Sequence, residues 1–546
     1  MRASVLLTSQ IIGIAYAALS AQRFANETLP PLLDATLDQL RQGLDTGALL
    51  SVNLVDAYLA RIGEVNGVVR AVTEINPDAR VIAEKLDAER KQSNGARILG
   101  PLHGIPVLIK NNIATADSMN NTAGSTALLG AKVPEDSPVV AKLRKAGAII
   151  LGKSNLSQWA NFRSTNSTNG WSAHGGQTVG AYYPGQDPSG SSSGSAVASS
   201  LGLAWASLGT ETAGSILSPA ALANTVGIKP TVGLTSRYLV IPISEHQDTV
   251  GPMARTVKDA AHLLAAIAGP DHNDNYTSAI PFSQVPDYIK VCKEDALKGK
   301  RLGIPRNLIS QLKSDPSVAA FESALKVLRG AGAEIIDDLA FPGLDILNRD
   351  FANASGVVLN SDFVSNLPDY LSLLVSNANN ITSLQSLRQF TQKNPAEEFP
   401  KRDTATWDEA LAQGFDKNAS EAQKTRDTIA YLAGTLGLTG ALKNFTLDAV
   451  VLPTTLAISN AALLGTPVVT VPLGRTPDST VTELNEFGNL NTTGPNLPFG
   501  IGFSGDRWSE ELLIGMAYAF EQKTQVRTSI KPFMQPKTEL RDVMRP

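Results

Sequence analysis

A segment built only of Pro, Ser and Gly, at residues 188–194, constrains this chain more than any other feature. Its sequence is Pro-Ser-Gly-Ser-Ser-Ser-Gly, and no side chain in it is large enough to pack a core. The backbone of such a loop must be held by hydrogen bonds or used for function. The small residues at 196–201 suit a helix, and the apolar run at 203–208 predicts a buried strand.

A second loop follows this strand and ends at Ser215. It runs Gly-Thr-Glu-Thr-Ala-Gly-Ser over residues 209–215, just before a helix expected from Pro219. A hydroxyl beside the free backbone N–H groups of a helix start can act as a nucleophile with oxyanion donors close by. Taken alone, such a serine is more commonly a helix N-cap, so its assignment as a nucleophile depends on the other motifs.

Three separated motifs in this chain resemble those of the amidase signature family. The first is Gly-Ile-Pro-Val-Leu-Ile-Lys at residues 104–110, the second is the loop at 188–194, and the third ends at Ser215. The similarity extends from about Leu32 to Thr524. It implies an α/β fold in which a central mixed β-sheet is flanked by helices on both faces. It also implies one amidase domain over residues 21–546, with a signature core at about 100–260 and a variable substrate-entrance region at about 340–440.

The resemblance implies a Ser-Ser-Lys triad made of Lys110, Ser191 and Ser215. Lys110 would be the neutral base, Ser191 would relay the proton, and Ser215 would attack the carbonyl to form an acyl-enzyme. A free lysine titrates near ~10.4, so burial or nearby cations must lower its pKa by several units. The family pattern further implies a cis Gly190–Ser191 peptide bond. The expected oxyanion hole consists of the backbone N–H groups of Thr212, Ala213, Gly214 and Ser215.

Four positions depart from the usual family residues. They are Asn111, commonly Asp; Gln158, often Glu; Ala213, commonly Gly or Asp; and Leu217, often Arg. Because two of these changes remove carboxylates, we expect the neutral form of Lys110 to be favoured in a less polar pocket. Glu211 is expected to orient the loops rather than to take protons. Ser192 and Ser193 are expected to stabilise their loop.

The remaining polar candidates and the element pattern have simpler interpretations. Asp248 and Arg255 are expected to form a structural pair. Ser137-Pro138 predicts a helix that ends at Lys145, Thr256 predicts the cap of a helix over 257–267, and residues 301–305 predict a strand. Alternation of helices with apolar strands indicates an α/β protein. The region from 351 to about 431 is predicted to be mostly helical.

Composition excludes several classes of function. The net charge is −4 without a basic tract, which argues against nucleic acid as a partner. Five histidines without zinc-type spacing and a single cysteine, Cys292, predict no metal site, no cofactor and no intrachain disulfide. We expect a small-molecule amide as the partner, and no stable membrane partner.

The N-terminus predicts a secreted protein. Arg2 precedes an uncharged stretch that ends near a small-x-small site at 18–20, which is typical of a signal peptide over residues 1–20. An uncleaved anchor is the alternative, although polar residues at 8–10 make the stretch short for a span. Sequons predict a glycoprotein. They begin at Asn26, Asn120, Asn155, Asn166, Asn275, Asn353, Asn380, Asn418, Asn444 and Asn491.

These features together predict an exported amidase without a cofactor. It would hydrolyse a non-peptide linear carboxylic acid amide to the acid and an amine or ammonia. One alternative is a glutamine amidotransferase component of the same fold, which the export signal and the altered motifs disfavour. The other alternative is a catalytically silent amidase-like binding protein. The intact Lys-Ser-Ser set disfavours that interpretation, whereas Ala213 and Leu217 leave it open.

Overall fold

The computed structural model describes residues 29–93, 99–312, 315–350 and 353–544. The predicted signal peptide at 1–20 and the sequon at Asn26 lie outside the described residues.

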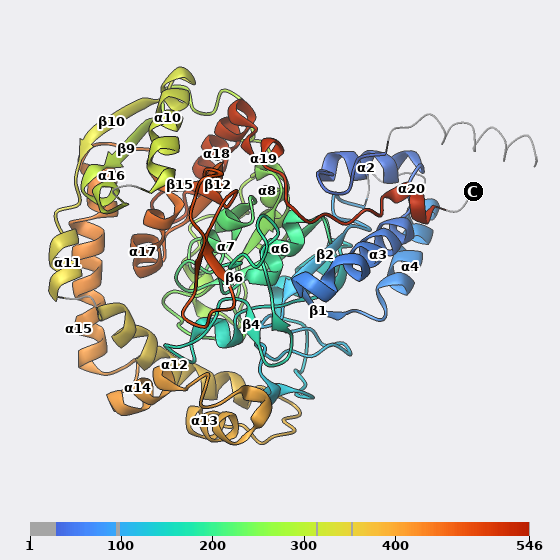
Figure 1. The fold of residues 1–546 in the computed structure, drawn as a ribbon, viewed down its shortest axis with the longest axis horizontal. Helices are drawn as coiled ribbons and strands as arrows, with labels where there is room; N and C mark the ends of the chain where they lie inside the picture. The colour runs from blue at the N-terminus through green and yellow to red at the C-terminus, as the bar shows by residue number, and fades with distance from the viewer. Residues whose placement is uncertain (1–28, 94–98, 313–314, 351–352, 545–546) are drawn as a thin grey trace, which may run out of the picture.

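An 11-stranded sheet forms the centre of the molecule (Figure 1), with the strand order β1-β3-β2-β6-β8-β7-β12-β15-β11-β9-β10. The strands are β1 (Val72–Ile75), β2 (Pro106–Lys110), β3 (Ile149–Ser154), β6 (Ala206–Glu211), β7 (Val226–Lys229), β8 (Thr249–Ala254), β9 (Arg301–Pro305), β10 (Glu334–Leu339), β11 (Ala449–Pro453), β12 (Val468–Arg475) and β15 (Pro498–Ser504). Strand β2 is parallel to β3 and β6, and β9 is parallel to β10 and β11. The other pairings are antiparallel, so the sheet is mixed, as the sequence predicted.

Helices flank this sheet in two groups. In one group α6 (Ser193–Ser200), α7 (Leu217–Leu222) and α17 (Thr454–Leu464) contact the sheet, and α7 contacts both of the other two. The other group consists of α8 (Val257–Ile267), α10 (Pro316–Gly330) and α18 (Glu510–Thr524). These helices also contact the sheet, and α18 contacts both of the other two. The remaining α-helices are α2 (Leu37–Thr46), α3 (Ser51–Val69), α4 (Ala79–Gln92), α5 (Pro138–Lys145), α9 (Arg306–Ile309), α11 (Leu344–Asp350), α12 (Ala354–Ser372), α13 (Leu384–Lys393), α14 (Ala405–Gln413), α15 (Ser420–Ile429), α16 (Leu438–Asn444), α19 (Val526–Ser529) and α20 (Leu540–Val543).

Several boundaries agree with the sequence signals. Helix α5 begins at Pro138 and ends at Lys145, and β9 spans the predicted residues. The Thr256 side chain caps α8 by accepting a hydrogen bond from the backbone N–H of Asp259. Proline at a first helical position and a threonine N-cap both satisfy helix-start requirements locally, which is why the sequence predicts these boundaries correctly.

The strand predicted at 203–208 is displaced toward the C-terminus. The structure has it at Ala206–Glu211, because its polar half pairs with β8 through Glu211–Thr249 and Thr210–Val250. The whole of β6 is buried. Hydropathy alone marks only the apolar half of such a strand, since the polar half gains its partners from a distant segment.

Residues 353–431 are mostly helical, as predicted, and build a second core together with part of the signature region. Helices α12, α13 and α14 gather at one end of the molecule (Figure 1). Their side chains, among them Phe363, Leu367 and Trp407, pack against Trp159 and Phe162 of the signature region. The Trp159 and Trp407 rings meet edge to face with centroids 5.7 Å apart. Such aromatic pairs add to the stability of a core beyond the area that they bury.

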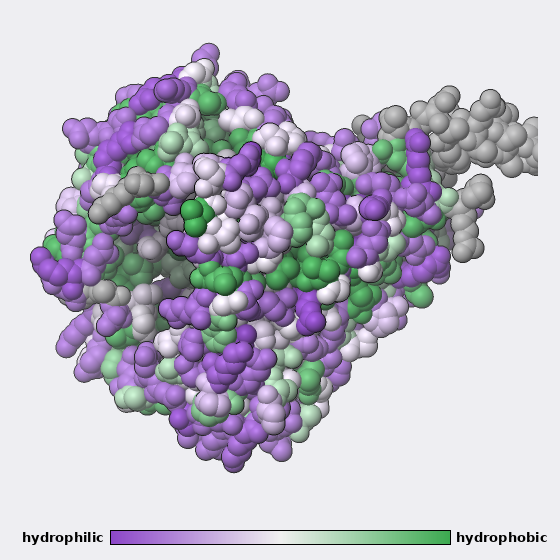
Figure 2. Space-filling view, viewed as in Figure 1, coloured by the Kyte–Doolittle hydropathy of each residue, from purple (hydrophilic) through white to green (hydrophobic). Residues whose placement is uncertain are grey.

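The face shown in Figure 2 is mostly hydrophilic, and its apolar side chains are scattered among polar ones. Across the part of the chain that the structure describes, none of the helices has the length and apolar character needed to cross a membrane.

Candidate active site

Lys110 lies at the end of β2, and its side chain is completely buried. Strand β2 is parallel to β6, so the chain just beyond Leu208 runs beside Lys110. Lys110 Nζ is 2.7 Å from Ser191 Oγ and 2.9 Å from Ser192 Oγ. It also contacts Thr210, at 2.9 Å from Oγ1 and 3.1 Å from the carbonyl oxygen. Two of the three predicted triad residues are therefore in direct contact.

The surroundings of Lys110 favour its neutral form. Burial lowers the pKa of Lys110 to about 7, and only part of this effect is offset by the carboxylates of Asp248 and Glu211. A lysine with this pKa is largely neutral at slightly alkaline pH, which a proton-accepting role requires. Its contacts are hydroxyl groups and a carbonyl oxygen, so either protonation state finds partners there.

The Gly/Ser loop carries Ser191 at a cis Gly190–Ser191 peptide bond. This feature was implied by the resemblance. The backbone N–H of Ser157 donates to the Ser191 carbonyl oxygen at 3.0 Å, which anchors the loop. The backbone N–H of Ser192 donates to the Ser215 carbonyl oxygen at 3.1 Å. The third predicted residue is thus tied to the same loop through its backbone. The Ser215 hydroxyl has no hydrogen-bond partner among the described residues.

The loop at 212–215 presents four backbone N–H groups without acceptors within the described residues. The next two N–H groups, of Ile216 and Leu217, both donate to Glu211 Oε2, at 2.7 and 2.9 Å. Gly214 has φ +86, which turns the loop sharply. Free N–H groups that converge beside a serine are the arrangement that stabilises a developing oxyanion. Glu211 orients this loop, as expected from the sequence.

Asp248 is a site residue whose role the sequence reasoning missed. The Thr212 hydroxyl donates to Asp248 Oδ1 at 2.6 Å, and the N–H groups of Ile243 and Ser244 donate to Oδ2. Burial raises the pKa of Asp248 to about 6.

The expected pairing of Asp248 with Arg255 is wrong. Arg255 instead donates to backbone carbonyls of Ser199, Ala204 and Ala35, because its guanidinium lies at the far end of β8.

Ser192 and Thr210 also do more than the sequence indicated. The Ser192 hydroxyl contacts Lys110 and donates to the Thr210 carbonyl oxygen at 3.0 Å, so it does not merely stabilise its own loop. Thr210 Oγ1 accepts hydrogen bonds from Lys110 Nζ and from Asn112 Nδ2, the latter at 3.0 Å. No sequence signal distinguishes these hydroxyls from neighbouring ones, since their role depends on the pairing of β2 with β6.

Two departures from the family pattern find polar partners away from Lys110. Asn111 Oδ1 accepts from the backbone N–H groups of Thr122 and Gly124, both at 3.2 Å, and from the Thr122 hydroxyl. Gln158 donates to Glu397 Oε2 at 2.7 Å, so a carboxylate from the variable region lies beside the position where the family often has one. Leu217, a third departure, is fully buried, whereas Ala213 is exposed.

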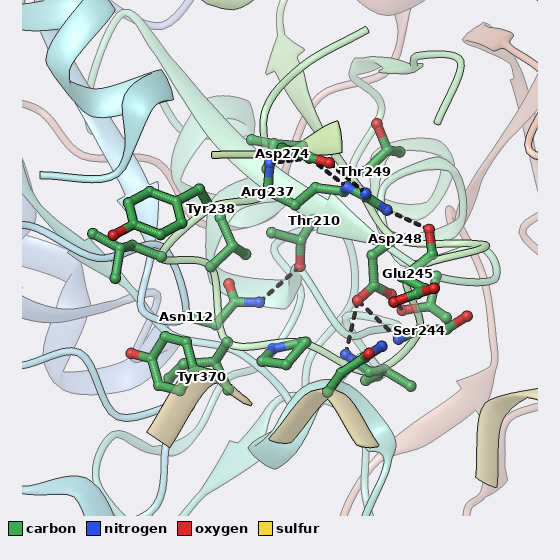
Figure 3. Close-up of a pocket in the computed structure, with 18 of the residues that line it drawn as sticks. Asn112, Thr210, Arg237, Tyr238, Ser244, Glu245, Asp248, Thr249, Asp274 and Tyr370 are labelled. Carbon is green, nitrogen blue, oxygen red and sulfur yellow. Dashed lines mark hydrogen bonds and ion pairs between the residues drawn. The ribbon is translucent and has the colours of Figure 1, made fainter. Parts of the chain in front are cut away.

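A cavity of about 220 Å³ opens beside this group (Figure 3). Thr210, Thr212 and Asn112 lie in its wall next to the Lys110 site, and the loop at 237–245 forms another side. Helix α12 contributes a third side with Asn366, Asp369 and Tyr370, and Leu373 follows directly after the helix. The cavity therefore lies between Thr212 of the 212–215 loop and the variable region. Neither His174 nor His246 lines it. Among the described residues, no group of three or more His, Cys, Asp or Glu side chains could hold a metal ion.

Comparison with protein families gives a match to the family described as Amidase over residues 53–514. A protein of Arthroderma benhamiae that is classed as an amidase is 52% identical over 540 residues, which cover 94% of this chain and 90% of that protein. A glutamyl-tRNA(Gln) amidotransferase component from Chloroflexus aurantiacus is 39% identical over a shorter span, with 55% of this chain and 60% of that protein covered.

Among solved structures, the native peptide amidase of Stenotrophomonas maltophilia is similar to this chain over nearly its whole length. The TM-score is 0.81 at 38% sequence identity, and the match covers 93% of this chain and 99% of that one. The peptide amidase PAM in complex with the competitive inhibitor chymostatin matches with a TM-score of 0.82 at 38% identity, over 92% of this chain and 99% of that one.

Proposed function

The chain belongs to the amidase signature family, and we propose that it hydrolyses a carboxylic acid amide through an acyl-enzyme formed on Ser215. One observation carries this proposal: a completely buried lysine, with its pKa lowered to about 7, lies 2.7 Å from the Ser191 hydroxyl. A buried amine without a counter-ion in contact is costly for a fold, and this one differs from the equally buried Lys153 because it contacts two serine hydroxyls of the Gly/Ser loop, which supports a catalytic use.

The proposed reaction starts with Lys110 as a neutral base. Lys110 accepts the Ser191 proton while Ser191 accepts the Ser215 proton, and Ser215 Oγ bonds to the amide carbonyl carbon. The N–H groups of the 212–215 loop stabilise the oxyanion. The proton then returns through Ser191 to the leaving nitrogen, the C–N bond breaks, and an ester to Ser215 remains. Water, deprotonated by the same route, cleaves this ester and releases the acid.

The cavity supports a carboxamide with a body of moderate size as the substrate. Its wall includes the apolar side chains of Leu239, Val240, Ile241 and Leu373. A cavity of about 220 Å³ is small beside typical sites for drug-sized ligands, which suits a compact substrate. The similarity to peptide amidase makes amides of amino acids and short peptides part of the substrate range to be tested.

A serine-directed fluorophosphonate probe tests the proposed nucleophile. We expect stoichiometric labelling, and peptide mass mapping should find the label on Ser215. Lys110→Met should slow labelling by at least ~100-fold, because the hydroxyl then has no base, while the protein stays folded. Lys153→Met is the matched control. Lys153 is equally buried and burial lowers its pKa to about 7 as well, yet its amine contacts Ile113 and Asn121. Unchanged labelling in Lys110→Met would reject the proposed triad.

We further propose that the chain is secreted and loses residues 1–20. The small-x-small site that follows an apolar stretch supports this. N-terminal sequencing of protein recovered from the medium of a eukaryotic secretory host should begin near Ala21. Retention of the intact N-terminus on cell membranes would favour an uncleaved anchor.

A further inference from the structure

The charges in the cavity wall point to a more specific substrate class. This inference rests on the proposed function and concerns the cavity beside that site, whose wall includes Thr210 and Thr212 but not Ser215. The carboxylic and basic side chains that line the cavity are Arg237, Glu245, Asp248, Asp274 and Asp369. Four of these side chains are carboxylic acids and one is a base. When a neutral or anionic substrate is bound, the cavity therefore keeps an excess of acidic groups.

Three of the five N–H groups of the single base in the wall are already used by the protein. Arg237 donates to both carboxylate oxygens of Asp274, at 2.8 and 2.7 Å, and to the Glu245 carbonyl oxygen (Figure 3). Its guanidinium also lies over the Tyr276 ring, 4.4 Å from the centroid. A substrate carboxylate would have to compete with the charge of this bidentate pair, which is one of the stronger arrangements in proteins.

Most of the acids in the wall are already compensated. Asp274 is paired with Arg237, and Glu245 forms an ion pair with Lys417 at 2.5 Å. Asp248 accepts hydrogen bonds from Thr212, Ile243 and Ser244. Asp369 differs from these three, because its exposed carboxylate has neither an ion pair nor a hydrogen bond within the described residues. It lies on α12, at the side of the cavity that belongs to the variable region.

Unfilled hydrogen-bonding capacity in the same wall also favours a donor-rich ligand. Asn112 Oδ1 and Tyr370 Oη are buried without a partner within the described residues, and both side chains line the cavity. The Asn112 amide is held in place by Thr210, as Figure 3 shows. Buried polar groups of this kind are ordinarily paired, so a ligand that donates hydrogen bonds would satisfy them once their side chains turn toward the cavity, from which neither atom is accessible now.

We propose that the enzyme prefers carboxamides that carry a positively charged amine on an apolar chain. The scissile carbonyl lies at Thr212, the chain lies against Leu239 and Ile241, and the ammonium group lies on the Asp369 side. The chemistry of the reaction itself is unchanged, since the charge acts only on binding. The expected preference is modest, because an exposed ion pair is worth at most about fivefold in affinity.

Three carboxamides of matched length test this preference: 6-aminohexanamide, hexanamide and the monoamide of adipic acid. Their dissociation constants are measured by calorimetry on the Ser215→Ala variant, which does not turn them over. We expect 6-aminohexanamide to bind about fivefold more tightly than hexanamide and the adipic monoamide to bind more weakly than both. Raising the salt concentration should compress these differences. Equal affinities, or tighter binding of the anionic amide, would overturn the proposal.

Variants assign the preference to one side chain. Asp369→Asn should remove the advantage of the cationic amide and leave hexanamide binding unchanged. Asp345→Asn, which neutralises an exposed acid on α11 outside the cavity, should keep the advantage. A preference that survives Asp369→Asn would contradict the assignment. The amidase function is tested separately, by measuring ammonia release. It would be rejected if the wild-type enzyme released no ammonia from any of a broad panel of amides. The binding measurement needs no turnover, so the two outcomes can be told apart.

Discussion

Glu397 accepts a hydrogen bond from Gln158 at 2.7 Å, and this contact joins the variable region to the signature core. Glu397 is fully buried. Its carboxylate also accepts hydrogen bonds from the Ser125 hydroxyl and the Thr126 N–H, and it forms an ion pair with the Arg163 guanidinium. A carboxylate with this many donors ties the segment between α13 and α14 to the signature core. The variable region and the signature core are therefore joined by one polar network.

Glu397→Ala should destabilise the protein by about 3–5 kcal/mol, because it leaves the Arg163 guanidinium buried without its partner. The measurement is urea unfolding followed by tryptophan fluorescence. Glu398→Ala is the control, since this carboxylate is exposed and its buried partner Arg402 keeps its contacts with Thr168 and Trp171, so the loss should be less than about 1 kcal/mol. Equal losses in the two variants would contradict the structural role given to Glu397.

The pH–rate profile should show an acid limb near the pKa of Lys110, which is about 7. The sign follows from the role of the group: burial lowers this pKa, so the amine is neutral and able to accept a proton above about pH 7, and it is protonated and inactive below. We expect kcat/KM for an amide to rise about tenfold per pH unit below about pH 7 and to level off above it. A flat profile between about pH 5 and 8 would show that no such base is used.

Asp248→Asn should move this acid limb to lower pH. The carboxylate of Asp248 raises the pKa of Lys110 by charge interaction, so its removal lets that pKa fall further. The amide oxygen of Asn can still accept from the N–H groups of Ile243 and Ser244, and its NH2 group can donate to the Thr212 hydroxyl, which keeps the 212–215 loop in place. The limb positions of the variant and the wild type are compared in one buffer series, and a limb at higher pH in the variant would contradict the expected sign.

The opposite change, Asn111→Asp, adds a carboxylate next to Lys110 along the chain and should move the limb to higher pH. The same buffer series measures this shift. An Asn111→Asp profile identical to the wild type would reject the idea that the missing carboxylate matters.

Gly214→Ala should lower kcat by about 100-fold or more, because it disturbs the expected oxyanion donors. Gly214 has φ +86, and an added Cβ would lie 3.1 Å from Ile458. Gly299→Ala is the matched control. Gly299 also has a positive φ, +73, but an added Cβ there meets nothing within 4 Å. Both substitutions cost about 1 kcal/mol of backbone strain, whereas only the first should affect turnover. Steady-state kinetics on both variants checks this, and full activity in Gly214→Ala would exclude the loop from oxyanion binding.

Secreted protein should carry an N-glycan at Asn380 and none at Asn155. The Asn380 side chain is exposed on a loop between α12 and α13. Asn155 is fully buried, and its Nδ2 donates to the carbonyl oxygens of Gly176 and Gly170 and to Thr178. Site occupancy is measured by mass spectrometry after enzymatic deglycosylation in isotopically labelled water. Occupancy at Asn155 would require a chain that is modified before it folds, and would contradict the buried position.

The sequence predicted the local parts of the fold and the meeting of Lys110 with Ser191. Helix α5 and the cap of α8 depend on adjacent residues, so they can be predicted directly. The roles of Asp248 and Glu397 could not be predicted, because their partners Thr212 and Gln158 lie 36 and 239 residues away in the chain. The predicted Asp248–Arg255 pair failed for a related reason. Opposite charges close in sequence are not close in space when a strand separates them.

The arrangement of the two cores has a consequence for heat inactivation. Lys110 ends β2, an internal strand of the sheet, whereas α12–α14 pack in a separate core at one end of the molecule. Packing units of unequal size loosen at different temperatures. On gentle warming, the enzyme should therefore lose its discrimination among amides while its nucleophilic serine still reacts.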